Sequence, residues 1–272
     1  MKQSFHRIAL AVTTAAALTA CGTTTTSGIA GSNRSQLLIV PASEVNQTAA
    51  LAYKQMNQEA RAKGKLITSG AEFNRVNTIM KRIVAQVGHF RPDAARWAWE
   101  LTLVNDNQIN AFAMPGGKIS FYTGIIRRLK LTDAEIAAVM GHEIAHALRE
   151  HSREKISQQK LGGAALAIGG AAAGLSGSSM ELAGLAKQLA LDLPFSRAME
   201  SEADVFGLEL AARAGYDPRA AITLWQKMSA ASGGGSGPSF LSTHPSDSNR
   251  QAELAALMPK VMPLYDASKK QR

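Results

Sequence analysis

One five-residue stretch of the sequence has the spacing of a metal site. His142 and His146 are four residues apart, and Glu143 directly follows the first histidine. On a helix, the two imidazoles differ by roughly 40° in azimuth, so both can reach one ion. Glu143 then lies to one side of the pair, where a water bound to that ion would sit. The spacing predicts a zinc site in which one helix supplies two ligands and a general base.

The residues around this motif predict a helix with one apolar face. Thr132 and Glu135 have the spacing of a capping box at its start. Apolar residues then recur at helical intervals, roughly opposite the two histidines. We expect a helix over residues 132–158 that buries one face and presents the histidines to a cleft. The alternative is a helix with two ordinary surface or packing histidines.

A catalytic zinc site usually has three protein ligands and one position for water, so a third ligand is needed. On a continuous helix His151 lies about 180° from His142 and faces away from it. A later segment carries Glu200, Glu202 and Asp204. Glu200 and Asp204 share one helical face, so the first could bind zinc and the second could orient a ligand histidine. Spacing alone does not choose Glu200 over Glu202, because acidic residues on helices are usually solvated.

Strand signals lie in the middle of the chain. Residues 97–104 are rich in β-favouring types, and residues 118–122 alternate in polarity. Between them, residues 110–114 read as a short strand that ends at a Pro-Gly-Gly turn. Helices are expected over residues 44–64 and 71–88. The sequence therefore predicts a mainly helical α+β domain with a small sheet.

The C-terminal half of the sequence predicts further helices. One covers residues 196–213, and a second opens with Asp217 as N-cap and Pro218 at the first helical position. A last helix is expected over residues 246–257. The Gly- and Ala-rich segment 161–179 is interpreted as a mobile flap or a loose helical hairpin, with an inert, closely packed segment as the alternative.

The motif H-E-x-x-H followed by E-x-E-A-D resembles the gluzincin metallopeptidases of family forty-eight. These include the CAAX prenyl proteases, the HtpX-type membrane proteases and periplasmic lipoprotein proteases. The resemblance extends from Asn105 to Arg250. It implies a zincin-like metalloprotease domain whose sheet has an edge strand beside the H-E-x-x-H helix. It also implies one Zn²⁺ per chain, with Glu200 as the third ligand beside His142 and His146, and Asp204 behind a ligand.

Two further segments contribute to the resemblance. One, residues 110–113, resembles the edge strand that pairs with the backbone of a substrate. The other, Thr243-His244-Pro245 followed by Arg250, resembles the family's C-terminal His-Pro element. The substrate-binding residues implied by the first are Asn110, Ala111, Phe112 and Ala113.

His244 and Arg250 each have more than one interpretation. His244 could donate to the oxyanion of the reaction, or it could become a fourth zinc ligand and block the water. A turn histidine fixed by Pro245 is the alternative without function. Arg250 could support the metal ligands or bind a substrate carboxylate, and a plain surface arginine is the alternative.

The first twenty residues have the organisation of an export signal. Lys2 and Arg7 precede a short apolar run over residues 8–18. The tetrapeptide that ends in Cys21 resembles the bacterial lipobox, in which the cysteine is lipidated and the chain is cut before it. Gly22 follows, and by resemblance this favours the outer membrane over the inner one. An ordinary signal peptide with an incidental cysteine is the alternative.

These patterns predict the organisation of the whole chain. Residues 1–20 are a lipoprotein signal peptide, residues 21–43 a lipidated flexible tether, and residues 44–272 a single peptidase domain with its core at about 97–250. The expected location is the periplasmic side of the bacterial outer membrane, through lipidated Cys21. The formal charge is +9, but the basic residues are dispersed and aromatics make up only 6%, so nucleic acid is not an expected partner.

The function expected from all of this is zinc-dependent endopeptidase activity in the bacterial envelope. By resemblance, the substrates are unfolded or misassembled envelope proteins. The alternative is a latched, mostly inactive protease that serves as a chaperone or assembly factor for outer-membrane proteins. A third alternative is a structural lipoprotein in which the motif is fortuitous, and such a protein would contain no zinc.

Overall fold

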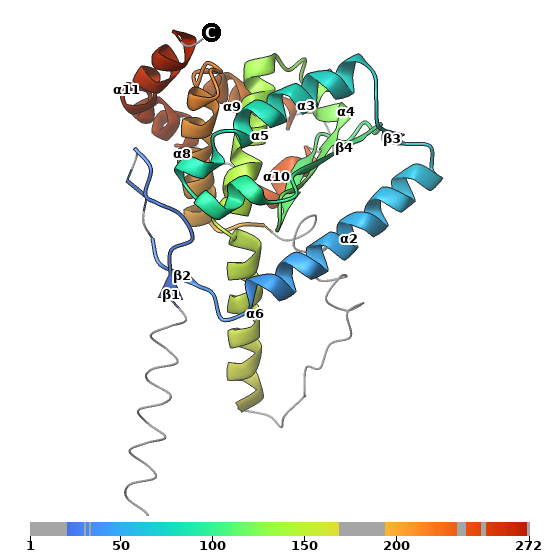
Figure 1. Ribbon diagram of the computed structural model, residues 1–272, viewed down its shortest axis with the longest axis vertical. Coiled ribbons are helices and arrows are strands. Elements are labelled where there is room, and N and C mark those ends of the chain that lie inside the picture. The colour runs from blue at the N-terminus through green and yellow to red at the C-terminus, as the bar shows by residue number, and fades with distance from the viewer. Residues whose placement is uncertain are drawn as a thin grey trace, which may run out of the picture.

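The computed structural model describes most of the chain as a mainly helical α+β fold with one small mixed sheet (Figure 1). This confirms the fold class predicted from the sequence. The residues that it describes are 21–29, 31–32, 34–168, 194–232, 238–245 and 249–270.

The described residues form both strands and helices. The strands are β1 (Cys21–Gly22), β2 (Gln36–Leu37), β3 (Leu66–Ile67), β4 (Glu100–Val104), β5 (Ala111–Met114) and β6 (Lys118–Tyr122). The helices are α2 (Ala42–Ala62), α3 (Ala71–Val84), α4 (Thr123–Arg128), α5 (Asp133–Leu148), α6 (His151–Ile168), α8 (Arg197–Arg213), α9 (Ala220–Ala231), α10 (Ser239–Thr243) and α11 (Arg250–Lys269). Two short 3₁₀ turns, Val87–His89 and Pro92–Arg96, join α3 to β4.

The four-stranded sheet has the order β3-β4-β6-β5, so β5 lies at one edge. β4 and β6 are parallel, and the other two pairs are antiparallel. β5 and β6 are joined by the predicted Pro-Gly-Gly turn, where Gly116 and Gly117 have φ of 78° and 82°. A Cβ on Gly117 would also lie 2.9 Å from the ring of Trp99, so this turn needs glycine for two reasons.

The two faces of the sheet pack against different helices. Leu103, Ile119 and Phe121 point into the main core, which α3, α5 and α8 complete. Phe112 and Met114 point to the opposite face, where Ala49, Ala52 and Tyr53 of α2 form a separate small cluster. Side chains alternate between the two faces along a strand, so the alternation predicted from the sequence explains why these residues belong to two separate cores.

Helix α5 is the centre of the fold, and its start is as predicted. Thr132 caps it through the amide of Glu135, and the Glu135 carboxylate accepts from the Thr132 amide. However, nearly every residue of α5 is buried, including both histidines. The expected cleft-facing side is therefore covered, because α8 and the segment around α10 pack over it.

The prediction of one helix over residues 132–158 is wrong. α5 ends at Leu148, Glu150 adopts a left-handed φ of 47°, and a separate helix, α6, starts at His151. Neither Arg149 nor Glu150 is a helix breaker, so the sequence gives no local signal for the break. Tertiary contacts of the buried Arg149 outweigh helix propensity here.

Two helices in the C-terminal half differ from the prediction. α9 begins at Ala220 rather than at Pro218, because the Asp217 side chain accepts from the Arg219 amide and closes a turn first. α11 begins at Arg250 and continues to Lys269, far beyond the predicted end at residue 257, and includes Pro259 and Pro263. Its buried residues Leu254, Val261 and Tyr265 hold it to the core despite the two missing amide donors. Beyond Ile168, the Gly- and Ala-rich segment lies outside the described residues.

The described part of the expected tether contacts the domain. The Thr26 amide donates to Phe90, and the Ile29 amide donates to Glu209. We call residues 34–40 the N-terminal strap; Val40 in it is buried and its carbonyl accepts from Arg153. The expectation of a flexible tether is therefore corrected at these positions, because backbone groups find partners that composition does not reveal. Among the described helices, none is long and apolar enough to cross a membrane.

The backbones of α5 and α8 touch where two glycines face each other. A Cβ on Gly207 would lie 2.6 Å from the His142 amide nitrogen, and one on Gly141 would lie 2.6 Å from the Gly207 carbonyl oxygen. Both contacts are with backbone, which cannot move aside without shifting a helix. This close approach places α8 directly beside the first histidine of the motif.

We expect Gly207→Ala to lower the free energy of unfolding by about 1–3 kcal/mol, the usual cost of overpacking. Denaturant unfolding of the metal-free protein measures this. The matched control is Gly88→Ala, whose new Cβ would meet only Ala95 at 3.9 Å and should leave stability unchanged. A Gly207→Ala protein as stable as the wild type would contradict the close contact.

Candidate metal centre

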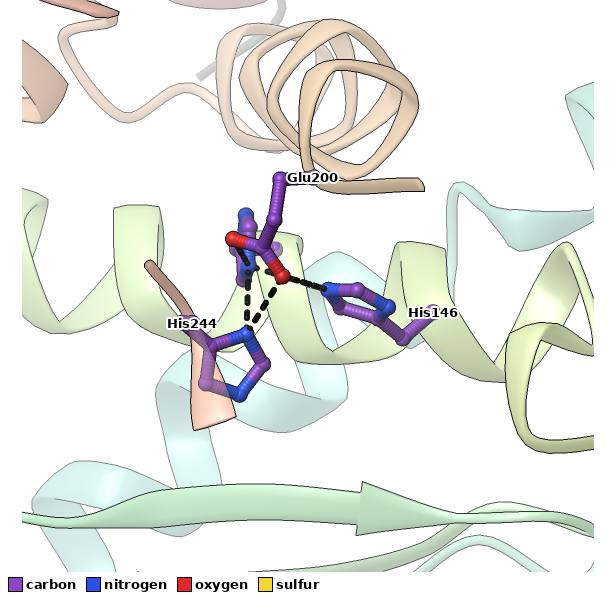
Figure 2. A group of neighbouring side chains, drawn as sticks. His146, Glu200 and His244 are labelled. Carbon is purple, nitrogen blue, oxygen red and sulfur yellow. Dashed lines mark hydrogen bonds and ion pairs between the residues drawn. The ribbon is translucent and has the colours of Figure 1, made fainter. Parts of the chain in front are cut away.

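Four buried side chains converge between α5, α8 and the end of α10. They are His142 and His146 from α5, Glu200 from the first turn of α8, and His244 just after α10. One ligand atom from each lies within 4.8 Å of every other. Figure 2 shows the Glu200 carboxylate pointing between the rings of His146 and His244. The structure thus brings the three predicted zinc ligands together and adds His244 to them.

The atoms that face one another are those that bind metals. Glu200 Oε1 lies 3.3 Å from His146 Nε2 and 2.9 Å from His244 Nδ1. Glu200 Oε2 lies 3.5 Å from His142 Nε2, which is itself 3.1 Å from His146 Nε2. Imidazole nitrogens and a carboxylate form the donor set that zinc prefers. The buried donor set therefore fits a zinc ion.

Glu143 supplies a second observation that fits a catalytic metal. Its Oε1 is a buried oxygen for which the described residues provide no hydrogen-bond donor. His244 Nε2 lies 3.4 Å from this oxygen. Burial raises the pKa of the Glu143 carboxyl above its ordinary value. An oxygen placed in this way, beside the donor set, could serve as a proton acceptor if a metal were bound there.

The other oxygen of Glu143 contacts the edge strand. The Ala113 amide donates to Glu143 Oε2 at 3.0 Å, and the Ala111 amide donates to the Asn110 side chain at 3.0 Å. The Tyr122 amide donates to the Asn110 carbonyl, so alternation directs the amides of Ala111 and Ala113 away from β6. The predicted substrate-binding strand therefore borders the predicted base. Phe112, by contrast, points its side chain to the opposite face, against α2.

Asp204 and Arg250 lie behind His142. His142 Nδ1 is 3.0 Å from Asp204 Oδ1, and Arg250 donates to both oxygens of Asp204 at 2.6 and 2.7 Å. Arg250 also donates to Glu200 at 2.9 Å and stacks on Trp225 at 3.5 Å. The surface interpretation of Arg250 does not fit, since this side chain is buried against two carboxylates.

The pKa values of the two α5 histidines are shifted in opposite directions, one by neighbouring carboxylates and the other by burial. Burial lowers the pKa of His142, but Glu200 and Asp204 outweigh it and raise that pKa to about 9. Burial lowers the pKa of His146 well below its ordinary value. The pKa of Glu200 is well below normal, because the charges of His244 and His142 outweigh its burial. Metal binding would therefore have to displace a proton from His142.

Sequence reasoning missed the groups behind His146. His151 Nδ1 lies 2.8 Å from His146 Nδ1, and His151 Nε2 lies 3.0 Å from Glu202. The helix break at Glu150 turns His151 back toward the site, whereas a straight helix would turn it away. The only signal in the sequence was Glu202 in E-x-E-A-D, which had been weighed as a ligand.

The segment that holds His244 is fixed at both ends. The Phe240 amide donates to the Ile109 carbonyl just before β5, and the Phe195 amide donates to the Thr243 carbonyl. The ring of Phe240 stacks on His244 with centroids 4.3 Å apart. The structure therefore holds His244 within the donor set and near the edge strand.

The family model of peptidase family M48 matches residues 70–258, which include the donor set, the base and the edge strand. The chain belongs to peptidase family M48. Zinc is the cofactor of this family, in agreement with the donor set described above, and the chain is a zinc metalloprotease. The enzyme class, the cofactor and the family predicted from the sequence are thus confirmed.

Curated relatives share the M48 region but are longer proteins. The chain is 39% identical over 186 residues to the mitochondrial metalloendopeptidase OMA1 of Schizosaccharomyces pombe, covering 68% of this chain and 52% of that protein. It is 41% identical over 170 residues to the Arabidopsis thaliana protein of that name, covering 62% and 34%. The Escherichia coli β-barrel assembly-enhancing protease is 26% identical over 218 residues, covering 76% and 43%. The chain spans about half the length of these relatives, or less.

These comparisons overturn the predicted location. The relatives at 39% and 41% identity are mitochondrial proteins, and the bacterial protease is more distant at 26%. The prediction of the periplasmic side of a bacterial outer membrane is therefore wrong. It rested on the few residues that precede Cys21, outside the region that the family model matches.

We expect Glu200→Ala to lose its zinc, because only Glu200 contributes a carboxylate to the donor set. Elemental analysis after dialysis against zinc-free buffer measures the bound metal. The control is Ser201→Ala, an exposed neighbour on the same helix, which should keep one zinc per chain. A Glu200→Ala protein that still binds one zinc per chain would rule Glu200 out as a ligand.

Proposed function

We propose that this M48 metalloprotease is an endopeptidase that cleaves unfolded or misassembled proteins at a membrane. The observation that supports it best is the position of Glu143. One oxygen of this carboxylate lies 3.4 Å from His244 of the donor set, and the other accepts from the outward amide of Ala113 on the edge strand. The proton acceptor and the strand that would hold a peptide are thus one hydrogen bond apart.

The residues of the site would each have a separate role in peptide hydrolysis. Bound zinc supplies Lewis acidity and makes a water molecule acidic enough to attack at neutral pH. His142, His146 and Glu200 hold the ion, with Asp204 and Arg250 fixing the ring of His142. Glu143 accepts the proton of the attacking water and returns it to the leaving amine.

A substrate would bind by adding a strand to the edge of the sheet. The amides of Ala111 and Ala113 point outward, and main-chain pairing with them grips a peptide with little dependence on its sequence. To pair there, the substrate must displace Asn110 Oδ1 and Glu143 Oε2 from those amides. Substrate binding would therefore release the base as it places the peptide bond nearby. An extended, unfolded segment is the form of protein that can do this.

The proposal includes a membrane anchor at Cys21. In it, residues 1–20 are a signal peptide, Cys21 receives a lipid and residues 21–43 join it to a domain over residues 44–272. The lipobox-like sequence supports this assignment. Cys21 pairs with Leu37 in the small β1-β2 sheet, so a lipid at Cys21 would begin beside the N-terminal strap.

We expect Glu143→Gln to keep its zinc and to cleave its substrate about 10²–10⁴-fold more slowly, since this is the usual contribution of a general base. The assay measures cleavage of an unfolded protein such as casein, with and without a chelator. Asp266→Asn makes the same chemical change at an exposed carboxylate far along α11 and should cut normally. Undiminished cleavage by Glu143→Gln would refute its role as base.

A latched protease that acts as a chaperone or assembly factor is the second candidate. It is favoured by His244, whose Nδ1 lies 2.9 Å from Glu200 Oε1 and 3.2 Å from His142 Nε2, so that it could occupy a fourth position on a bound ion. The same segment, through Phe240, bonds to the carbonyl of Ile109 at the entrance to the edge strand. The printed name of the Escherichia coli relative, a β-barrel assembly-enhancing protease, is in line with an assembly role.

His244→Ala distinguishes the two candidates. If His244 is a latch, its removal opens the fourth position, and we expect casein cleavage to rise several-fold at unchanged zinc content. If His244 instead donates to the oxyanion, cleavage should fall by about 10²–10³-fold. A rise favours the latched protease, and a fall favours the constitutive endopeptidase.

A further inference from the structure

A row of buried polar groups extends from His146 away from the donor set. His146 Nδ1 lies 2.8 Å from His151 Nδ1, and His151 Nε2 lies 3.0 Å from Glu202 Oε2. His146 and Glu202 are at most 5% exposed, and His151 is completely buried. None of these contacts includes an atom of the proposed catalytic reaction. The row reaches the donor set through His146.

The far end of the row is a charged carboxylate. Arg149 donates to Glu202 at 2.9 Å, and Arg34 of the N-terminal strap donates to both of its oxygens at 3.2 and 3.0 Å. Arg34 also binds Glu154 through two hydrogen bonds of 2.6 and 2.9 Å. Two guanidinium groups thus face two carboxylates. Glu202 is ionised and can only accept hydrogen bonds.

The positions of the protons follow from this charge. Because Glu202 only accepts, His151 must donate to it from Nε2. A neutral imidazole has one N–H, so His151 Nδ1 must be an acceptor. The bond of 2.8 Å then requires His146 to donate from its own Nδ1. His146 Nε2 is left with a lone pair, and this is the atom that faces Glu200 at 3.3 Å.

We propose that His151 is a positioning residue that holds His146 in the tautomer able to bind zinc through Nε2, with Glu202 as its anchor. The inference rests on the zinc site of the proposed function. Each ligand histidine of α5 then has a carboxylate and an arginine behind it. His142 contacts its carboxylate, Asp204, directly. His146 reaches Glu202 through a second imidazole, because the break after α5 places a ring in the intervening space.

The first test is the zinc affinity of variants, measured by competition with a chelator of known affinity rather than by activity. His151→Phe keeps an aromatic ring but gives His146 Nδ1 no acceptor, and zinc should bind about 10–100-fold more weakly, as is typical when such a partner is lost. His151→Gln offers an amide oxygen to His146 and should recover most of the affinity. The control is His89→Phe, the same change at an exposed histidine, which should bind zinc as the wild type does.

The outcomes separate this inference from the zinc site itself. If His151→Phe binds zinc within two-fold of the wild type, the positioning role is wrong. If both His151 variants are folded by circular dichroism and equally weakened, hydrogen bonding to His146 is not the cause, and the inference also fails. If the wild-type protein binds no zinc, the proposed function fails instead.

A measurement on the unmutated protein avoids any dependence on variant folding. In the zinc-loaded chain labelled with ¹⁵N-histidine, NMR reports which ring nitrogen of each histidine has the proton. We expect a proton on Nδ1 of His146 and on Nε2 of His151. A proton on Nδ1 of His151 would mean that His151 donates to His146 rather than accepting from it, and this would overturn the proposal.

Discussion

Backbone contact between α5 and α8 sets the geometry on which the metal centre depends. Gly141 and Gly207 leave no side chain between the two helices, so α8 lies directly against the turn that begins with His142. Glu200, two helical turns before Gly207, is thereby brought to the nitrogens of His142 and His146. Ligands on two rigid helices in direct contact keep their separation better than ligands on loops would.

The centre also has to stabilise many charged groups away from water. Isolated buried charges are costly, and here each carboxylate has an arginine or a histidine beside it. Arg250 holds Asp204 and Glu200 on one side, and Arg149 with Arg34 holds Glu202 on the other. The metal donors therefore lie between two charge-paired clusters, and the rings of His142 and His146 are oriented from behind by those clusters.

Much of the fold and the donor set could be predicted from the sequence, since their signals are local. The capping box at Thr132, the turn at Gly116 and the spacing of His142 and His146 each fix geometry within a few residues. The assignment of Glu200 over Glu202 needed the family resemblance, because both lie on one helix and spacing does not separate them.

What could not be predicted depends on contacts between distant segments. The break after Leu148 has no breaker residue and follows from the burial of Arg149 against the N-terminal strap. Because the sequence predicts one continuous helix, the ring of His151 is expected to point away from the site. Similarly, α11 continues through Pro259 and Pro263, beyond the predicted end at residue 257. Burial of Val261 and Tyr265 offsets the lost amide donors.

The strap changes where the functional unit begins. The family model matches from residue 70, yet Arg34 pairs with Glu154 and Glu202, and Gln36 donates to Glu154 from a fully buried position. A recombinant fragment that begins at residue 70 would lack Arg34, which pairs with both of these acids. Any minimal version of this metalloprotease should therefore start before Arg34, although the family model alone would place its boundary some thirty-six residues later.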